Sequence, residues 1–320
     1  MDRRKFISSV AVLGAGAALL DAKTMVDMAG APSERRRRKK KSGDKDENLV
    51  CIISDLHCNP DEYQEAKLRR TVADILTLDP LPANVLALGD VAYLQGRHHE
   101  YVRLKEIVSP IEAAGIKLTM AMGNHDRRKQ FSEVFPEKAA ESLVKDRLVF
   151  LVETPRADII VLDSLQESYP DPDVGIVPGA IDDAQKAWLQ DTLNSYSSKP
   201  VFVTAHHALN ETGIKAMLVD SPTCCGYIHG HLHYWQPGWF RKNYNPDNRI
   251  IRSLCVPSTG HWGDIGYTLL KLGEESATAY LHQYEFFFPR PLAEGQEKPI
   301  LWSMIEEEHA GVVCKFAYNK

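Results

Sequence analysis

Hydrophobic residues from Asn48 onward occur in short runs rich in β-branched side chains, and these runs alternate with segments of helical periodicity. The apolar runs predict strands at residues 49–54, 84–88, 116–122, 157–163, 200–205 and 226–229. The helical periodicity predicts helices at residues 61–78, 98–114 and 181–195. Strands and helices that alternate along a chain are typical of layered α/β proteins, so we expect an α/β fold.

The pattern changes after His233. Residues 249–255, 267–272 and 277–285 are predicted to be strands, with few helical segments between them. We therefore expect a second sheet that is more antiparallel than the first. No Pro- or Gly-rich linker divides this part of the sequence, and residues 48–320 are predicted to form one domain.

The first 31 residues resemble an export signal. Arg3, Arg4 and Lys5 precede residues 6–20, which carry no charge, and small residues follow at Ala29-Gly30-Ala31. The uncharged stretch is too short to span a bilayer, so we expect no transmembrane span in the mature protein. The order Arg3-Arg4-Lys5-Phe6-Ile7 is similar to a twin-arginine signal, which predicts a periplasmic or otherwise exported protein. An uncleaved amphipathic anchor is the alternative.

Charge is distributed unevenly along the chain. Residues 1–31 carry a net charge of +1 and residues 32–47 carry +4. Because the whole chain carries −5, residues 48–320 carry −10. The seven consecutive basic residues at 35–41 predict that residues 32–47 form a basic, disordered linker, with attraction to an anionic surface or polymer as the alternative. The acidic remainder argues against a nucleic acid partner, because tight binding to duplexes depends on Lys and Arg.

Five short motifs each follow a predicted strand. They are Asp55-Leu56-His57, Gly89-Asp90, Gly123-Asn124-His125-Asp126, His206-His207 and Gly230-His231-Leu232-His233. Ligands of open α/β sheets gather at the carboxyl ends of strands, so these side chains can converge. Each motif alone is weak, but together they supply enough Asp, Asn and His donors for two cations.

Together these motifs resemble the calcineurin-like metallophosphoesterase superfamily, whose pattern is D-x-H, GD, GNH(D/E), a His at a strand end and GHxH. The resemblance implies a four-layer α/β/β/α sandwich with two mixed β-sheets and a dinuclear metal site at the carboxyl ends of strands. It also implies which residues hold the two metals, and these are Asp55, His57, Asp90 and His233 for one and Asp90, Asn124, His206 and His231 for the other. His207 is expected to support or pack rather than to bind metal.

The activity implied is hydrolysis of a small phosphate ester by a hydroxide that bridges the metals. Two divalent or trivalent ions are expected, with iron, manganese and zinc equally suited to mixed donors of this kind. His125 would stabilise the transition state or protonate the leaving group, and Asp126 would orient its neighbours. The exact substrate and the oligomeric state stay open.

Within the superfamily, the sequence is most similar to class III cyclic-nucleotide phosphodiesterases and the related glycerophosphodiesterases. The similarity lies in GNHDRRKQF at residues 123–131 and in residues 179–193, whereas Arg127 and Ala208 depart from the usual acid and Pro. The likeness favours phosphodiesters as substrates. It also implies that His261, after the turn Pro257-Ser258-Thr259, contacts the substrate phosphate.

Three alternatives remain. Gly89-Asp90-Val91-Ala92-Tyr93 matches the GDxxY of purple acid phosphatases, in which the Tyr binds iron, although His57 stands where that group has a Gly. A non-catalytic scaffold of the same fold, such as the retromer subunit, is the second alternative, and a nuclease is the third. The six cysteines allow disulfides, but the sequence does not say which would pair.

Overall fold

A computed structural model describes residues 44–59, 62–167, 178–241, 249–287 and 313–318. The predicted export signal and residues 32–43 of the predicted linker lie outside these residues. The prediction was wrong for the end of the linker, because β1 (Lys45–Ile53) already begins at Lys45. Lys45 and Asp46 pair with β2, and Asp46 forms an ion pair with Lys271, so partners elsewhere in the fold order this charged segment.

The first sheet has the strand order β12-β11-β10-β1-β2-β3. Its parallel half consists of β1, β2 (Leu81–Leu88) and β3 (Lys117–Ala121), which are connected through helices. Its antiparallel half consists of β10 (Gly263–Leu272), β11 (Ser276–Phe287) and β12 (Val313–Ala317). The sheet is therefore mixed.

The second sheet has the order β4-β5-β6-β7-β9-β8. Its four central strands are parallel, and they are β5 (Asp158–Val161), β6 (Val201–Thr204), β7 (Cys224–His229) and β9 (Ile251–Cys255). The two edge strands, β4 (Phe150–Val152) and β8 (Gln236–Phe240), are antiparallel to their neighbours. Buried β-branched and aromatic residues in β5 and β6 explain why these strands are central.

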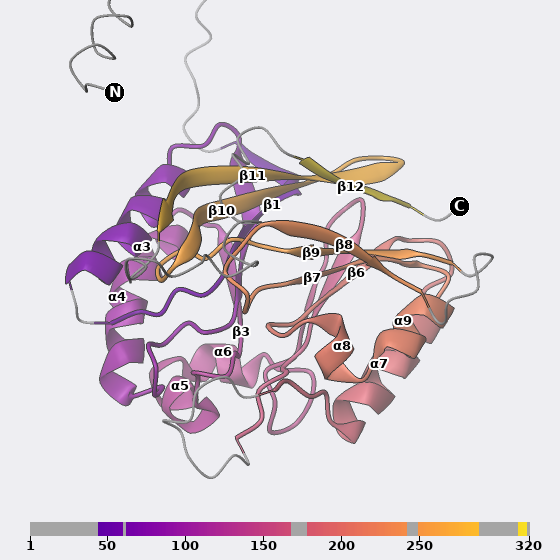
Figure 1. The fold of residues 1–320 in the computed structure, drawn as a ribbon, viewed down its shortest axis with the longest axis horizontal. Helices are drawn as coiled ribbons and strands as arrows, with labels where there is room; N and C mark the ends of the chain where they lie inside the picture. Colours follow the sequence, from indigo (N-terminus) through magenta and orange to yellow (C-terminus); the bar gives the residue numbers. More distant parts are fainter. Residues whose placement is uncertain (1–43, 60–61, 168–177, 242–248, 288–312, 319–320) are drawn as a thin grey trace, which may run out of the picture. The chain divides into compact units, whose positions relative to one another are not determined.

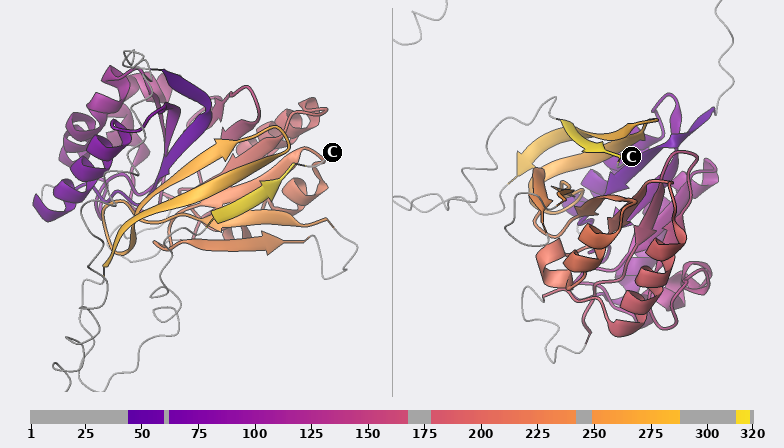
Figure 2. Two further views of the ribbon diagram at one scale, coloured as in Figure 1. Left: turned by 90° about the horizontal axis from the view of Figure 1, so that it is seen from above. Right: turned by 90° about the vertical axis from the view of Figure 1, so that its right-hand side faces the viewer.

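Helices cover the outer face of each sheet, as Figures 1 and 2 show. Beside the first sheet lie α3 (Glu62–Ile75), α4 (His98–Ala113), α5 (Arg128–Val134) and α6 (Pro136–Ala140). Beside the second sheet lie α7 (Asp183–Ser195), α8 (Leu209–Thr212) and α9 (Lys215–Asp220). The carboxylate of Asp182 accepts a hydrogen bond from the backbone N–H of Gln185, and this cap sets the start of α7.

The two sheets pack against each other through a shared core. Ile52 and Leu86 of the first sheet belong to the same buried cluster as Phe202 and Leu254 of the second. The rings of Phe202 and Phe316 lie 5.2 Å apart, edge to face, across the two sheets. The order of layers is thus helix, sheet, sheet, helix, and the predicted four-layer α/β fold with two mixed sheets is confirmed.

The prediction of a separate antiparallel sheet after His233 was wrong. The strands β10 and β11 extend the first sheet beside β1, whereas β9 joins the second sheet parallel to β7. β1 is buried along its second half, so its backbone groups need partners on both sides, and β2 supplies only one side. Periodicity identifies a strand but does not say which open sheet edge will take it.

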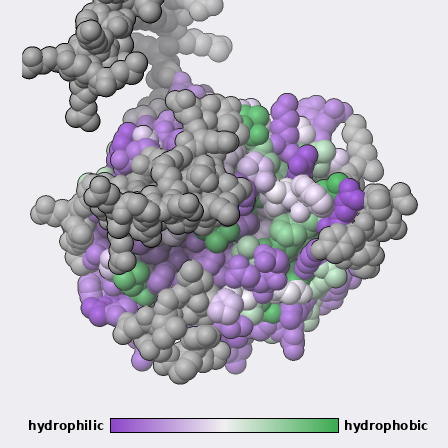
Figure 3. All heavy atoms as spheres, in the orientation of Figure 1, coloured by the Kyte–Doolittle hydropathy of each residue, from purple (hydrophilic) through white to green (hydrophobic). Residues whose placement is uncertain are grey.

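No helix in the described part of the chain is long and apolar enough to cross a membrane. On the face shown in Figure 3, hydrophilic residues predominate and hydrophobic areas are interspersed among them.

Candidate active site

All the predicted ligands follow the carboxyl ends of strands, and both sheets contribute. Asp55 and His57 follow β1, Asp90 follows β2 and Asn124 follows β3. His206 follows β6, while His231 and His233 follow β7. These strands are parallel within each sheet, so their carboxyl ends meet at one edge, where the loops bring the seven side chains together.

Backbone strain is concentrated in the same residues. Asp55, His57, Asp90, His231 and His233 have positive φ values of 51°, 42°, 46°, 71° and 63°. Asp146 is the one further non-glycine residue with positive φ among those the structure describes. The left-handed conformation costs an ordinary residue on the order of 1–3 kcal/mol, and it persists only where the surroundings enforce it. The surrounding structure therefore offsets the strain of a backbone conformation that orients these five side chains.

Hydrogen bonds between the loops hold the strained backbone in place. The N–H of Asp55 donates to the carbonyl of Gly89 at 3.1 Å, and the N–H of His57 donates to that of Asp90 at 2.9 Å. The carboxylate of Asp126 accepts from the N–H groups of Val91, Ala92 and Gly123 and from the hydroxyl of Tyr101. Asp126 is fully buried and connects the loop after β2 to the loop after β3. This position suits the orienting role predicted for it.

Glycine is required in two of the motifs by close approach. Gly89 has a φ of 88°, and a Cβ there would crowd the His206 ring and the backbone of Gly123. A Cβ on Gly123 would overlap the Asp90 carboxylate. Gly89 therefore lets His206 and Gly123 lie close to the loop that carries Asp90. Gly123 lets its own loop lie against the Asp90 carboxylate.

Three of the predicted ligands form a first group. The Nε2 atom of His233 lies 3.1 Å from Oδ1 of Asp55 and 3.4 Å from Nε2 of His57. On the other side of its ring, His233 places Nδ1 3.1 Å from the carbonyl oxygen of Trp262. That carbonyl can only accept, so Nδ1 carries the proton and the lone pair of Nε2 faces the group.

A second group surrounds His206. Its Nε2 atom lies 3.2 Å from Oδ2 of Asp90 and 3.1 Å from Oδ1 of Asn124, while its Nδ1 faces the carbonyl oxygen of Leu88 at 2.8 Å. The His231 ring lies 5.0 Å from the His206 ring. Asp90 belongs to both groups, because its Oδ2 is also 3.8 Å from Nε2 of His57.

This donor set fits bound cations. If the rings of His206 and His233 are neutral, with Nδ1 protonated toward carbonyls, each Nε2 lone pair faces an oxygen that also accepts. Such contacts repel unless a proton or a cation lies between them. The site attracts positive charge: burial lowers the pKa of His206, but the carboxylate of Asp90 raises it by more, to about 9. Burial also raises the pKa of Asp90, but the His206 charge more than offsets this and holds it below its ordinary value.

His125 and His261 lie beside the first group. The His57 ring is 5.2 Å from the His125 ring and 4.3 Å from the His261 ring. The backbone N–H of His125 donates to Oδ1 of Asp90 at 2.8 Å, and its Nδ1 lies 2.9 Å from the carbonyl oxygen of Leu94. Burial, with the neighbouring His233 and His125, lowers the pKa of His261 to about 4, which leaves this ring neutral at neutral pH.

The Tyr93 ring lies 6.1 Å from the His261 ring, edge to face. His57 lies beside Asp90 and His233, at the position where purple acid phosphatases have a Gly.

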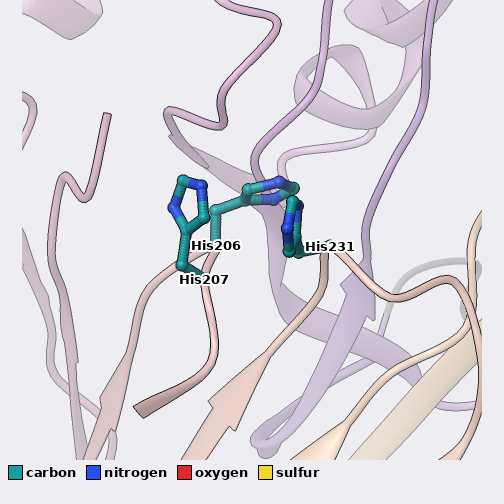
Figure 4. Close-up of side chains that lie close together, drawn as sticks. All are labelled: His206, His207 and His231. Carbon is teal, nitrogen blue, oxygen red and sulfur yellow. The ribbon is translucent and has the colours of Figure 1, made fainter. Parts of the chain in front are cut away.

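The sequence predicted a supporting role for His207, and the structure places its ring beside those of two predicted ligands. Figure 4 shows His206, His207 and His231 with their rings gathered together, and the His207 ring is 4.7 Å from that of His231. Its Nδ1 is 2.8 Å from the hydroxyl of Ser164, and these three histidines could together hold an ion. The doubled His at a strand end was the available signal. The carbonyl of Trp262 had no signal in the sequence.

Comparison with known proteins agrees with this geometry. Residues 49–235 match the calcineurin-like phosphoesterase family. A probable cyclic nucleotide phosphodiesterase of Rhodopseudomonas palustris is 30% identical over 154 residues, 47% of this chain and 52% of that protein. The 3',5'-cyclic adenosine monophosphate phosphodiesterase of Pseudomonas aeruginosa is 29% identical over 206 residues, 60% of this chain and 66% of that protein. The chain thus spans between half and two thirds of these relatives.

A solved structure shares the fold. A dimetal phosphatase from Danio rerio superposes with a TM-score of 0.57 at 14% identity, covering 73% of this chain and 95% of that one. The family match covers more than half of the 320 residues and includes all five motifs. The chain belongs to the calcineurin-like phosphoesterase family.

Proposed function

We propose that this protein hydrolyses phosphodiesters, with cyclic nucleotides or glycerophosphodiesters as the substrate class, and that it uses two bound cations. The observation that carries the proposal is the pair of ligand groups that share Asp90, with two further imidazoles beside one group. The two curated relatives named as cyclic nucleotide phosphodiesterases support the same substrate class.

The residues of the first group would hold one cation and those of the second group the other, and Asp90 would serve both. The first set is Asp55, His57, Asp90 and His233, and the second is Asp90, Asn124, His206 and His231. When bound, such cations would lower the pKa of a coordinated water and offset the charge on the phosphate.

His125 is suited to proton transfer. Its Nδ1–H donates to the carbonyl oxygen of Leu94, so a second proton on the ring lies on Nε2, from where it can pass to the departing oxygen. Its backbone N–H is fixed by Asp90, so the ring keeps its place relative to the ligands. His125 is only partly buried, which leaves it accessible to a substrate.

The neutral His261 favours a diester over a monoester. A diester carries one negative charge where a monoester carries two, so a neutral imidazole donor can complement a diester without a further cation. A phosphomonoesterase of the purple acid phosphatase kind, with Tyr93 as an iron ligand, is the alternative that the comparison of diester with monoester turnover tests.

The test is an assay of purified protein on bis(p-nitrophenyl) phosphate, p-nitrophenyl phosphate and cyclic nucleotides, with metal analysis of the same sample. We expect two metals per chain and faster turnover of diesters. His125→Ala should lower diester turnover by about 10²-fold or more, as loss of a proton donor does, and His261→Ala should lower it less. Both variants should keep their metals. Faster turnover of the monoester, or a metal-free wild type with full activity, would refute the proposal.

A further inference from the structure

His261 is held from two sides by one helix. The carbonyl oxygen of His261 accepts a hydrogen bond from Nζ of Lys67 at 3.1 Å, and its ring nitrogen Nδ1 lies 3.1 Å from Nε2 of Gln64. Gln64 and Lys67 stand three positions apart on α3, so they share one face of that helix. Main chain and side chain of His261 are therefore both positioned from α3.

The loop that carries His261 is also fixed to the D-x-H loop. The N–H of His261 donates to the hydroxyl of Ser258 at 3.0 Å, and that hydroxyl donates to the carbonyl of Asp55 at 3.0 Å. A Cβ on Gly260 would overlap the carbonyl oxygen of Leu56. Because the backbone of His261 is held in this way, the property of its ring that remains to be assigned is which nitrogen carries the proton.

The orientation of the Gln64 amide decides that question. Its Nε2 faces His261, and its Oε1 is buried without a hydrogen-bond partner among the described residues. The opposite orientation would bury the two N–H donors of the amide without partners, and unpaired buried donors are costly. Because an amide nitrogen donates and does not accept, Nδ1 of His261 must be the acceptor, and its proton must lie on Nε2.

We infer that Gln64 is a positioning residue that fixes His261 in the tautomer with the proton on Nε2, so that this nitrogen offers a hydrogen bond to a phosphate oxygen. The effect of Gln64 on catalysis rests on the proposed phosphodiesterase function, whereas the tautomer of His261 does not. Gln64 does not touch the reacting atoms. It acts by reserving Nδ1 of His261, which leaves Nε2 to contact the ligand.

The decisive variant is Gln64→Glu, which keeps the shape of the side chain but replaces the donor with an acceptor. A carboxylate at this position would take a hydrogen bond from Nδ1–H of His261 and so move the proton to the wrong nitrogen. Gln64→Leu removes the contact without reversing it. Gln190→Glu makes the same chemical change at an exposed position on α7 and serves as the matched control.

The tautomer can be read directly from the ¹⁵N chemical shifts of the imidazole, measured on zinc-loaded protein with labelled histidine. His261→Ala identifies the signals by their loss. We expect Nε2 protonated and Nδ1 unprotonated in the wild type and in Gln190→Glu, and Nδ1 protonated in Gln64→Glu. Turnover of bis(p-nitrophenyl) phosphate should fall about tenfold to a hundredfold in Gln64→Glu and less in Gln64→Leu. The range is that found for residues that orient a metal-binding imidazole.

Two results would overturn the inference. One is a wild-type signal with Nδ1 protonated or a tautomer that Gln64→Glu leaves unchanged. The other is a changed tautomer in Gln64→Glu with wild-type turnover of the diester. If the wild type hydrolysed no diester at all, the proposed function would fail, and the ¹⁵N shifts would still decide whether Gln64 sets the tautomer.

Discussion

Asp90 is the residue on which both ligand groups depend. One of its carboxylate oxygens faces His57 and His206, the other accepts from the N–H of His125, and its own carbonyl accepts from the N–H of His57. Asp55 also lies close to His206, but Asp90 is the residue whose carboxylate faces a histidine of each group. The charge of Asp90 should therefore matter for both cations.

We predict that Asp90→Asn loses both metals and lowers turnover by at least about a hundredfold, since even residues that only orient a metal ligand are worth 10–100-fold. Asn keeps the size of the side chain and removes its charge. Metal analysis and diester assays of the purified variant check the prediction. Asp158→Asn is the control, because Asp158 is also buried but stands at the amino end of β5. Two ions per chain in Asp90→Asn would contradict the shared role.

At the scale of elements, an ion pair joins α5 to the second sheet. Arg128, the first residue of α5, binds both carboxylate oxygens of Asp163 at 2.6 and 2.8 Å, and Asp163 follows β5. The Asp163 side chain is fully buried and also accepts from the N–H groups of Leu148 and Leu165. The pair connects the helix after the GNHD motif to the opposite sheet.

We predict that Arg128→Ala lowers the free energy of unfolding by about 3 kcal/mol, because it leaves a buried carboxylate without its partner. Arg156→Ala should cost less than about 1 kcal/mol, since the pair of Arg156 with Glu274 is exposed. Urea unfolding of both variants measures the difference. Equal losses would mean that burial of Asp163 does not decide the strength of the pair.

For the whole molecule, the cysteines contribute packing rather than crosslinks. All six are buried thiols, and burial raises the pKa of Cys51, Cys58, Cys224, Cys255 and Cys314 above the ordinary range for a thiol. A disulfide would typically add about 2–4 kcal/mol of stability. We predict that the thermal midpoint is the same with and without a reductant. A drop of several degrees on reduction would reveal a disulfide.

The route out of the cytoplasm stays a proposal. Residues 1–31, which lie outside the described residues, should direct a fused reporter out of the cytoplasm, and Arg3→Lys together with Arg4→Lys should stop this. Twin-arginine routes carry folded proteins, and buried thiols suit a chain that folds before export. Cell fractionation with both fusions checks the prediction, and unchanged export of the double variant would point to another route.

The sequence by itself located the strands that the ligand motifs follow, the longer helices α3, α4 and α7, and the residues at those strand ends. Local periodicity is enough to identify such elements, and Asp, Asn and His after successive parallel strands must meet at one sheet edge. For this reason Asp55, Asp90 and His206 could be named as candidate ligands before their distances were known.

Only the tertiary structure decided where the strands after His233 belong, because pairing depends on which sheet edges remain open once the rest of the chain has folded. It also decided the left-handed backbone at five of the candidate ligands, a strain that only the surrounding loops can enforce. The contact of Gln64 with His261 joins positions 197 residues apart, and no local pattern records such a pairing. Long-range hydrogen bonds, not sequence spacing, thus orient the imidazoles of the site.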